Sequence, residues 1–376
     1  MKIKFETSKE PERELLGVLI ATPFGRGGMG GIDRLMDAVQ DELEKLQDEK
    51  ILVRILPTRG KGGLYQSPLL LTWFIVRMVV AKVLGRVDLV HLNLSQRGST
   101  YRKVAIAGIA HKIGVPFILH LNGSAFDKFV DNSDGISKAV IKNMFERAEK
   151  ILVVGNFWKS YISSFVPQRA DRIIIIPNST APIHLRINPS PEGTVRIVFL
   201  GLIGDRKGIP QLLEALAANA DLEDWSAVLA GNGEVEKTKA KLKLLGLSDR
   251  VTVPGWVGPD AVASYLSNSD ILVLPSLEEN LPVSVVEGMA AGLAVIATPV
   301  GAVEDIIVDG ITGLLVQPGD AGELAAALRR LLQDEKLRLR LGQAAHNFHQ
   351  QNLEIGPYVN KLLEIWRLAA QEKGRL

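Results

Sequence analysis

The chain has 376 residues, of which 47% are hydrophobic and 23% charged, a composition typical of a folded globular protein with enough apolar material for two domains. Its 44 basic and 42 acidic side chains leave a formal charge of +2 at pH 7, so the totals give no electrostatic reason to expect a nucleic-acid partner. The absence of cysteine excludes disulfides, thiolate metal sites and a cysteine nucleophile, and it is compatible with a reducing compartment.

The first predicted strand, LLGVLIATP (15–23), follows a charged start without the pattern of a secretory signal and leads into the glycine-rich GRGGMGGIDRLM (25–36). Glycines let the backbone approach a ligand closely. A dinucleotide-binding loop is an alternative, but the ordered G-x-G-x-x-G spacing is missing and no acidic residue is clearly placed about 20 positions later. We expect Gly30 and Gly31 to border a ligand; a plain structural turn is the other interpretation.

The segment PLLLTWFIVRMVVAKVLG (68–85) is strongly apolar, but Arg77 and Lys82 interrupt it, which argues against a membrane span. The pattern favours a largely buried helix of an α/β domain. The alternative is a helix that lies on a bilayer with both cations near the head groups. We therefore expect a cytoplasmic protein, with the inner face of the membrane as a second location and peripheral membrane contact through the first domain.

The strand PFILHLN (116–122) ends in HLNGSAF, where His120 and Asn122 point to the same side because they are two residues apart. Asn122 can donate to a sugar hydroxyl but cannot carry a proton charge. A lone strand histidine is more often a satisfied buried residue than a catalyst, so His120 faces either a cleft or a covered surface. His91 is expected to be structural.

Short apolar runs recur along the whole chain between longer helical segments, and many lack the alternation of half-exposed strands. Continuous β-branched runs are typical of strands that helices cover on both faces, and repeated strand–helix units indicate parallel sheets. The runs are LLGVLIATP, ILVRILP, VDLVHLN, PFILHLNG, KILVVGN and RIIIIPN, then TVRIVFLG, SAVLAGNG, RVTVPGW, DILVLPS, LAVIATP and GLLVQPG. The fold class predicted is α/β, with two Rossmann-like doubly wound domains that face each other across a cleft. Ligands bind beyond the carboxyl ends of such strands.

The segment LRINPSPEGTVR (185–196) contains two prolines and little apolar material, so it is the best candidate for an interdomain linker. We predict an N-terminal domain over residues 1–186 and a C-terminal domain over residues 195–356. The tail over 357–376 has apolar residues at helical spacing. It predicts an amphipathic helix that packs back on the first domain.

The loop GLIGDRKG (201–208) lies between a predicted strand and a helix. A strand end that contains glycines and is followed by cations suits a diphosphate group. A solvated pair formed by Arg206 and Lys207 is the alternative. Further loops at strand ends carry Gly231 and Gly233, and then Trp256 and Val257.

The stretch SLEENLPVSVVEGMAAG (276–292) places Glu279 in a strand-to-helix loop and Glu287 inside the helix that follows. The backbone N–H groups near Asn280 to Ser284 begin that helix, which makes them a ready phosphate site. Carboxylates beside bound phosphate are useful if they accept hydrogen bonds from sugar hydroxyls. Two surface glutamates remain the alternative. No metal-binding constellation is visible in the sequence.

The run PSLEENLPVSVVEGMAAGLAVIATPVGAVEDIIVDGITGLLVQPGD (275–320) resembles, nearly end to end, the donor-binding region of glycosyltransferase family 4, retaining enzymes of the GT-B fold that use nucleotide sugars. The similarity extends to FLGLIGDRKGIPQLLEAL, LAGNGE and RVTVPGWV, and more weakly to GRGGMGGIDRLM, HLNGSAF, ILVVGNFWKSYI and IPNS in the first half. The branch it resembles most builds bacterial surface polysaccharides.

The resemblance implies that the N-terminal domain (1–186) binds the acceptor and the C-terminal domain (195–356) the donor, and it implies a role for each candidate residue. Glu287 is expected to bind the nucleotide ribose, and Glu279 to lie near the transferred sugar and its phosphate. Lys207 is the expected phosphate-binding lysine. The resemblance places Asn280 and Leu281 at the diphosphate or sugar, Gly30 and Gly31 near the donor phosphate or acceptor, and Gly231, Gly233, Trp256 and Val257 around the base. The implied catalytic set is Glu279, Lys207, Arg206, Asn122 and His120.

Three positions depart from the family pattern. Leu202 stands where members usually have an arginine, Asn122 where many have a histidine, and Asn280 where a small glycine is usual. Arg206 offers a second cation by another route.

The expected function is metal-independent retaining transfer of a hexosyl group from a UDP- or GDP-linked sugar to a saccharide, lipid-linked or small-molecule acceptor. The nucleotide sugar is a co-substrate, and no other cofactor is expected. Two alternatives stay open: a sugar-nucleotide epimerase or glycogen-synthase-like enzyme, and a nucleotide-sugar-binding regulatory protein that has lost turnover.

Overall fold

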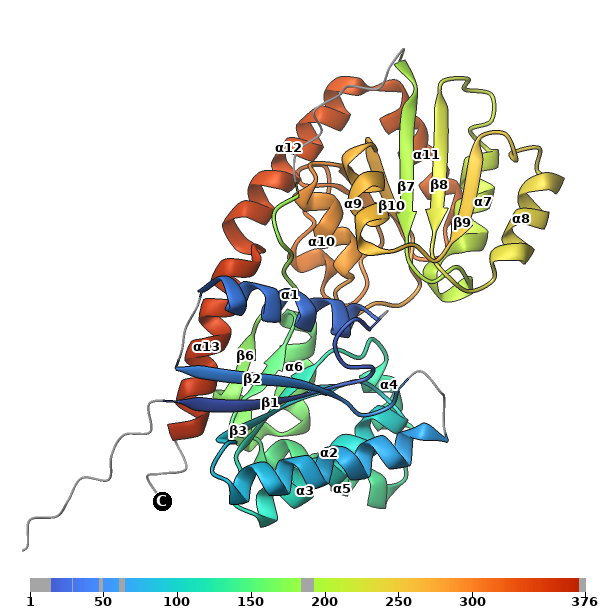
Figure 1. Cartoon of the computed structure of the whole chain (residues 1–376). Helices are drawn as coiled ribbons and strands as arrows, with labels where there is room; N and C mark the ends of the chain where they lie inside the picture. The colour runs from blue at the N-terminus through green and yellow to red at the C-terminus, as the bar shows by residue number, and fades with distance from the viewer. Residues whose placement is uncertain (1–14, 29, 47–49, 61–64, 184–192, 372–376) are drawn as a thin grey trace, which may run out of the picture.

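The computed structural model describes residues 15–28, 30–46, 50–60, 65–183 and 193–371 (Figure 1). Most of the predicted linker 185–196 lies outside these residues, as does Met29 of the glycine-rich loop. The described chain forms two sheets of six parallel strands with helices around them. This confirms the predicted α/β fold with two Rossmann-like domains.

The first sheet has the strand order β2-β1-β3-β4-β5-β6, and the second has the order β12-β11-β10-β7-β8-β9. Every predicted apolar run forms one of these strands. They are β1 (Leu16–Thr22), β2 (Ile51–Pro57), β3 (Leu89–Leu94), β4 (Phe117–Leu121), β5 (Ile151–Val153), β6 (Ile173–Ile175), β7 (Val195–Leu200), β8 (Trp225–Ala230), β9 (Val251–Gly255), β10 (Ile271–Leu274), β11 (Ala294–Ala297) and β12 (Leu314–Leu315). The central strands β3, β4, β10 and β11 are buried along their whole length, as their continuous apolar sequences require.

The helices cover both faces of each sheet. The longer helices of the first half are α1 (Gly31–Leu46), α2 (Gln66–Val83), α3 (Gly98–Lys112), α4 (Phe126–Asp131), α5 (Gly135–Arg147) and α6 (Asn156–Phe165). Those of the second half are α7 (Ile209–Ala217), α8 (Val235–Leu244), α9 (Pro259–Ser267), α10 (Val283–Ala290), α11 (Ala321–Gln333), α12 (Glu335–Asn352) and α13 (Ile355–Gln371). The first sheet lies between α1 and α13 on one face and α2, α3 and α5 on the other.

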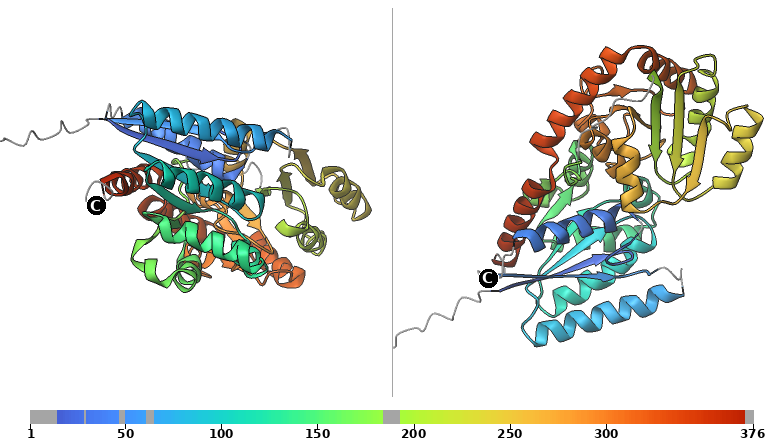
Figure 2. Two further views of the ribbon diagram at one scale, coloured as in Figure 1. Left: turned by 90° about the horizontal axis from the view of Figure 1, so that it is seen from below. Right: turned by 45° about the horizontal axis from the view of Figure 1, so that its top comes forward.

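Helix α13 returns to the first sheet, although it follows the second domain in sequence. Its Trp366 is fully buried among Ile20 and Ile118 of that sheet, and Trp366 Nε1 donates to His91 Nδ1 at 3.2 Å. The chain crosses over where Thr180 N donates to the carbonyl of Leu353 at 3.1 Å. Figure 2 shows α12 and α13 running along one side of both domains. The last helix therefore ties the two sheets together.

Helix α2 differs from the prediction. Among the described residues it is the helix whose length and composition would allow it to cross a membrane, but only 17% of it is buried. Phe74 and Met78 contact the core, whereas Leu69 and Val83 are 74% and 80% exposed. The expectation of a largely buried helix is therefore wrong. Its apolar residues extend around the whole helix, and the sheet covers only one narrow side (Figure 1).

Candidate active site

A cavity of about 490 Å³ lies between the two domains, where the carboxyl ends of strands from both sheets meet. Its volume is in the range of small-molecule sites. Parallel strands place the loops that follow them at one edge, so two facing sheets concentrate their loops on the same space. Residues distant in sequence thus share one site.

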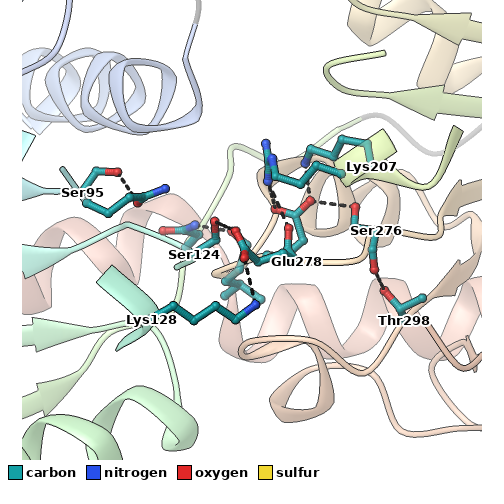
Figure 3. Close-up of polar contacts among 12 residues, drawn as sticks. Ser95, Ser124, Lys128, Lys207, Ser276, Glu278 and Thr298 are labelled. Carbon is teal, nitrogen blue, oxygen red and sulfur yellow. Dashed lines mark hydrogen bonds and ion pairs between the residues drawn. The ribbon is translucent and has the colours of Figure 1, made fainter. Parts of the chain in front are cut away.

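Glu279 and Lys207 form an ion pair in the second-domain wall. Both side chains are about nine-tenths buried, and Lys207 Nζ donates to Glu279 Oε1. Ser276 Oγ donates to the same carboxylate oxygen at 2.8 Å, and its own carbonyl accepts from Thr298 Oγ1 at 2.5 Å (Figure 3). The loop after β10 therefore holds a fixed carboxylate against a fixed ammonium group.

Arg206 stabilises the same loop from outside. Its guanidinium donates to the carbonyl of Glu278 at 3.0 Å and lies 4.0 Å from Glu279 Oε2. The Leu277 N–H donates to the Arg206 carbonyl at 2.9 Å. The two cations that the sequence placed side by side therefore act on neighbouring parts of one acidic loop.

The start of α10 forms the floor beside this pair. Leu281, Val283 and Ser284 border the cavity, and Pro282 precedes the first helical residue. The first N–H groups of a helix have no acceptor within the helix and attract anions. This floor can therefore bind a phosphate group next to Lys207.

The loops after β7 and β8 close the next side. Gly231 has a φ of +155°, and a Cβ there would lie 1.7 Å from the carbonyl oxygen of Gly201. Gly233 does not border the cavity; it pairs with Ile203 and fixes one loop against the other. Leu202 is 46% exposed and borders the cavity where the family resemblance expects an arginine.

Trp256 and Val257 border the cavity after β9, and the Trp256 side chain is 54% exposed. An exposed indole at a cavity edge offers a flat surface on which a nucleotide base can stack. At this exposure Trp256 does not fill the core.

The first-domain wall contains Gly30, Gly31, Ser95, Gln96 and Asn122. A Cβ on Gly31 would lie 3.7 Å from Val283 of α10, so the glycine-rich loop approaches the second domain closely. Asn122 Nδ2 donates to Asn93 Oδ1 and to the His120 carbonyl, both at 3.1 Å. These bonds fix the amide at the cavity wall.

His120 lies outside the cavity lining and is fully buried on the face that α13 covers, where its Nδ1 is 3.2 Å from His91 Nε2. Burial lowers the pKa of His120 to about 4, so the ring is neutral near pH 7. The catalytic role expected for His120 is therefore not compatible with its position. Of the two orientations that the sequence left open, the covered face is the one observed.

Several polar contacts hold the two domains together beside the cavity. Asn280 Nδ2 donates to the Leu121 carbonyl at 3.1 Å, and Asn178 Nδ2 donates to the Leu281 carbonyl at 2.6 Å. Glu278 accepts from Ser124 Oγ at 3.0 Å and from Lys128 Nζ at 3.2 Å (Figure 3). Asn280, which is larger than the usual glycine, therefore contacts the first domain and also borders the cavity.

Glu287 is 7% exposed and is not among the residues that border the cavity. Its Oε1 accepts from the guanidinium of Arg34, which belongs to α1 of the first domain and does border the cavity. Burial lowers the pKa of Arg34. The expected ribose-binding carboxylate is thus paired across the domain boundary.

A buried polar cluster supports the glycine-rich loop. Asp33 Oδ1 accepts from the Phe24 N–H at 3.0 Å, and a Cβ on Gly28 would lie 2.5 Å from the Asp33 side chain. Lys103 Nζ donates to Thr58 Oγ1 at 2.9 Å. Burial raises the pKa of Asp33 and lowers that of Lys103 to about 7.

The sequence analysis did not single out Arg34, Ser124, Asn178, Glu278 or Lys103. Arg34 lies within the quoted GIDRLM and Glu278 within SLEEN, but neither motif shows a partner in the other domain. Only the folded arrangement identifies them. Among the described residues, no group of three or more His, Asp or Glu side chains is arranged to hold a metal ion.

Comparison with known proteins agrees with this geometry. The family model for glycosyl transferases group 1 matches residues 182–348, which contain the second sheet and the Glu279 loop. This segment, less than half of the chain, is similar to that family. It contains Lys207, Glu279 and α10, and the first sheet lies outside it.

Individual relatives extend the comparison beyond residues 182–348. An uncharacterized glycosyltransferase of Methanocaldococcus jannaschii is 28% identical over 244 residues, which cover 65% of this chain and 66% of the relative. The alpha-D-kanosaminyltransferase of Streptomyces kanamyceticus is 32% identical over 173 residues, covering 46% of this chain and 45% of the relative. The matches thus span about half to two thirds of these relatives.

A solved structure resembles both domains together. The sucrose-phosphate synthase from Thermosynechococcus elongatus superimposes with a TM-score of 0.77 at 18% identity, covering 94% of this chain and 98% of that one. At this identity the likeness shows the fold alone, which is the predicted GT-B arrangement.

Proposed function

We propose that the protein is a retaining glycosyltransferase that moves a hexosyl group from a UDP- or GDP-linked sugar to a hydroxyl of a saccharide, lipid-linked or small-molecule acceptor. The observation that carries the proposal is the buried pair of Glu279 and Lys207 beside the start of α10, in one interdomain cavity. The group 1 family match of the second domain supports the same conclusion.

The chemistry follows from where charge develops. As the bond between the anomeric carbon and the diphosphate oxygen breaks, its electron pair stays on the diphosphate. Lys207 and the first N–H groups of α10 would stabilise that charge, and Glu279 would accept hydrogen bonds from sugar hydroxyls. The acceptor oxygen would bond to the anomeric carbon on the face that the diphosphate leaves, and its proton would pass to the leaving phosphate. The nucleotide sugar is the only co-substrate in this proposal.

Closure of the two domains favours transfer over hydrolysis. The contacts of Asn280 with Leu121 and of Asn178 with Leu281 bring the walls together directly beside the cavity. A closed cavity excludes water that would otherwise attack the donor. The first domain would then present the acceptor hydroxyl from the side of Asn122 and Gln96.

Donor consumption measured by chromatography tests the proposal. Lys207→Met is expected to lower the rate by roughly 100- to 1,000-fold, the usual cost of losing one transition-state donor. Glu279→Gln should cause a comparable loss because the variant leaves Lys207 without its carboxylate. Lys241→Met, an exposed lysine of α8 outside the cavity lining, is the matched control and should retain activity.

A regulatory nucleotide-sugar-binding protein is the second candidate, and exposed Leu202 at the cavity wall favours it. Its signature would be a wild type that binds nucleotide but consumes neither UDP- nor GDP-linked sugars with any acceptor. That result would replace the transferase proposal. Consumption that depends on Lys207 would exclude the regulatory candidate.

We also propose that α2 contacts an anionic bilayer, which would place the enzyme at the inner face of the membrane in the cytoplasm. Leu69, Trp73, Val76, Val80 and Val83 are exposed on this helix. Residues 51–126 contain ten lysines and arginines and one acidic residue, whereas the whole chain is nearly neutral. Figure 2 shows α2 on the outside of the first domain. Apolar side chains beside an excess of positive charge suit an interface with anionic lipids.

Sedimentation with phosphatidylcholine vesicles, with and without phosphatidylglycerol, tests this contact. Binding should require the anionic lipid, and the double substitution Trp73→Ser, Val80→Ser should reduce it at least tenfold, because each buried apolar side chain contributes about 1.5–3 kcal/mol. Leu244→Ser is the control, since Leu244 is 83% exposed on α8 of the second domain. Equal binding by the α2 variant would contradict the proposal.

A further inference from the structure

Arg34 is a cation that the first domain places at a cavity whose other bordering cations, Arg206 and Lys207, belong to the second domain. It lies in the first turn of α1, directly after the glycine-rich loop. In the described part of the chain, its guanidinium has one hydrogen-bond partner, Glu287 Oε1. A guanidinium has five N–H donors in a planar fork that suits phosphate groups, so most of this donor capacity is unused.

Glu287 is incompletely satisfied in the same arrangement. Its second oxygen, Oε2, is buried and has no hydrogen-bond partner among the described residues. A buried carboxylate oxygen without a donor is costly, so such atoms usually mark a place where a ligand or water binds. A ligand hydroxyl can provide the missing donor.

The two carboxylates and two of the cations form parallel pairs. Lys207 pairs with Glu279 within the second domain, and Arg34 pairs with Glu287 across the domains. A nucleoside diphosphate brings phosphate charge for both cations and ribose hydroxyls for a carboxylate. Leu202 contributes no charge to this wall, and the Arg206 guanidinium donates to the Glu278 carbonyl. Arg34 borders the same cavity and adds a cation from the opposite wall.

We propose that Arg34 is a donor-binding residue contributed by the first domain, which exchanges Glu287 for the diphosphate when the nucleotide sugar enters. Glu287 then accepts hydrogen bonds from ligand hydroxyls, and the diphosphate takes the place of the carboxylate between the domains. The ion pair between Arg34 and Glu287 holds the cavity in shape until the donor arrives. This inference rests on the proposed function and names how its donor is recognised.

Calorimetric titration with UDP, GDP and the corresponding nucleosides separates contact with the diphosphate from support of Glu287. Arg34→Gln should weaken binding of the preferred diphosphate at least tenfold, because a charge-assisted contact to phosphate is lost. Binding of the nucleoside should change less than threefold. Arg34→Lys should recover part of the affinity for the diphosphate only, since lysine keeps the charge without the fork.

Arg26→Gln is the matched control, because Arg26 also pairs with carboxylates of α1, Asp41 and Glu44, but is exposed and does not border the cavity. It should leave both affinities unchanged. Equal losses of diphosphate and nucleoside binding in Arg34→Gln would show that Arg34 acts only by holding Glu287, and would overturn the inference. Unchanged binding would overturn it as well.

The outcome for the wild type distinguishes the two proposals. A wild type that binds neither diphosphate contradicts the proposed function together with the role of Arg34. A wild type that binds one of them, with Arg34→Gln indistinguishable from it, contradicts the role of Arg34 alone. Thermal unfolding of each variant establishes whether it is folded. If Arg34→Gln is not folded, the comparison of Arg34→Lys with the wild type provides the test.

Discussion

The second-domain wall of the cavity includes one contiguous motif beside its other loops, whereas the first-domain wall comes only from four separate loops. Glu279, the start of α10 and Glu287 lie within twelve residues of each other, as SLEENLPVSVVEG shows. Gly30, Ser95, Asn122 and Asn178 follow four different strands. A contiguous motif carries its own geometry, but scattered loops acquire theirs only when the sheet forms.

The two walls also differ in what supports them. Backbone contacts through glycines hold the second-domain loops, as at Gly231 and Gly301. Buried side chains hold the first-domain loops, as at Asp33 and Lys103. Gly301 and Lys103 therefore test one support of each kind.

The largest effect is expected for Gly301→Ala. Gly301 has a φ of +63°, and a Cβ there would lie 2.3 Å from the Asn280 carbonyl oxygen and 2.4 Å from that of Glu279. We expect a loss of about 2–4 kcal/mol in the free energy of unfolding and roughly a hundredfold loss of donor consumption, because the Glu279 loop must shift. Chemical denaturation and the consumption assay measure both.

Gly310→Ala is its matched control. Gly310 has a similar φ of +69° but nothing within 4 Å of the added carbon. Only backbone strain remains, which costs about 1 kcal/mol. If both variants lose the same stability and activity, the close packing of Gly301 against the Glu279 loop does not matter.

A smaller, pH-dependent effect is expected for Lys103→Met. Burial lowers the pKa of Lys103 to about 7 from its ordinary 10.5, so between about pH 7 and pH 10 the unfolded chain holds a proton that the folded protein has released. The free energy of unfolding of the wild type therefore rises with pH in this window. Relative to Lys103→Met, the free energy of unfolding of the wild type should increase by up to about 1.4 kcal/mol per pH unit.

Denaturation of both proteins at several pH values measures that gain. Lys112→Met, on the same helix but exposed, should follow the wild type at every pH. If the difference in the free energy of unfolding between wild type and Lys103→Met stays constant from pH 6 to pH 10, the buried lysine does not titrate in that range. The charge of Lys103 would then not contribute to the support of the first-domain loops.

Much of the fold could be predicted because buried parallel strands have a simple signature. Every short apolar run that was predicted as a strand became one, and no long-range information was needed. The misjudged helix was α2, where an apolar sequence indicated burial but Phe74 and Met78 are its only fully buried apolar residues. Composition alone cannot show whether a surface is covered by the protein itself.

The parts of the candidate site that depend on contacts close in sequence could be predicted, and the parts that depend on distant contacts could not. Glu279, Lys207 and the start of α10 are contributed by strand-end motifs, and they meet in the cavity. The pairing of Arg34 with Glu287 joins positions 253 residues apart, so no local pattern indicates it. His120 shows the converse case: its place at a strand end suggested the cleft, but α13, the last helix of the chain, covers that face.

Thermal unfolding with UDP and GDP tests the central claim most directly, namely that Lys207 and the start of α10 bind a nucleoside diphosphate in the interdomain cavity. At 100 times its dissociation constant, the preferred nucleotide should stabilise the wild type by about 2.7 kcal/mol and raise its Tm. Lys207→Met should show no rise at the same concentration, and Lys241→Met should match the wild type. Absence of a rise with either nucleotide, or an equal rise in Lys207→Met, would contradict the account.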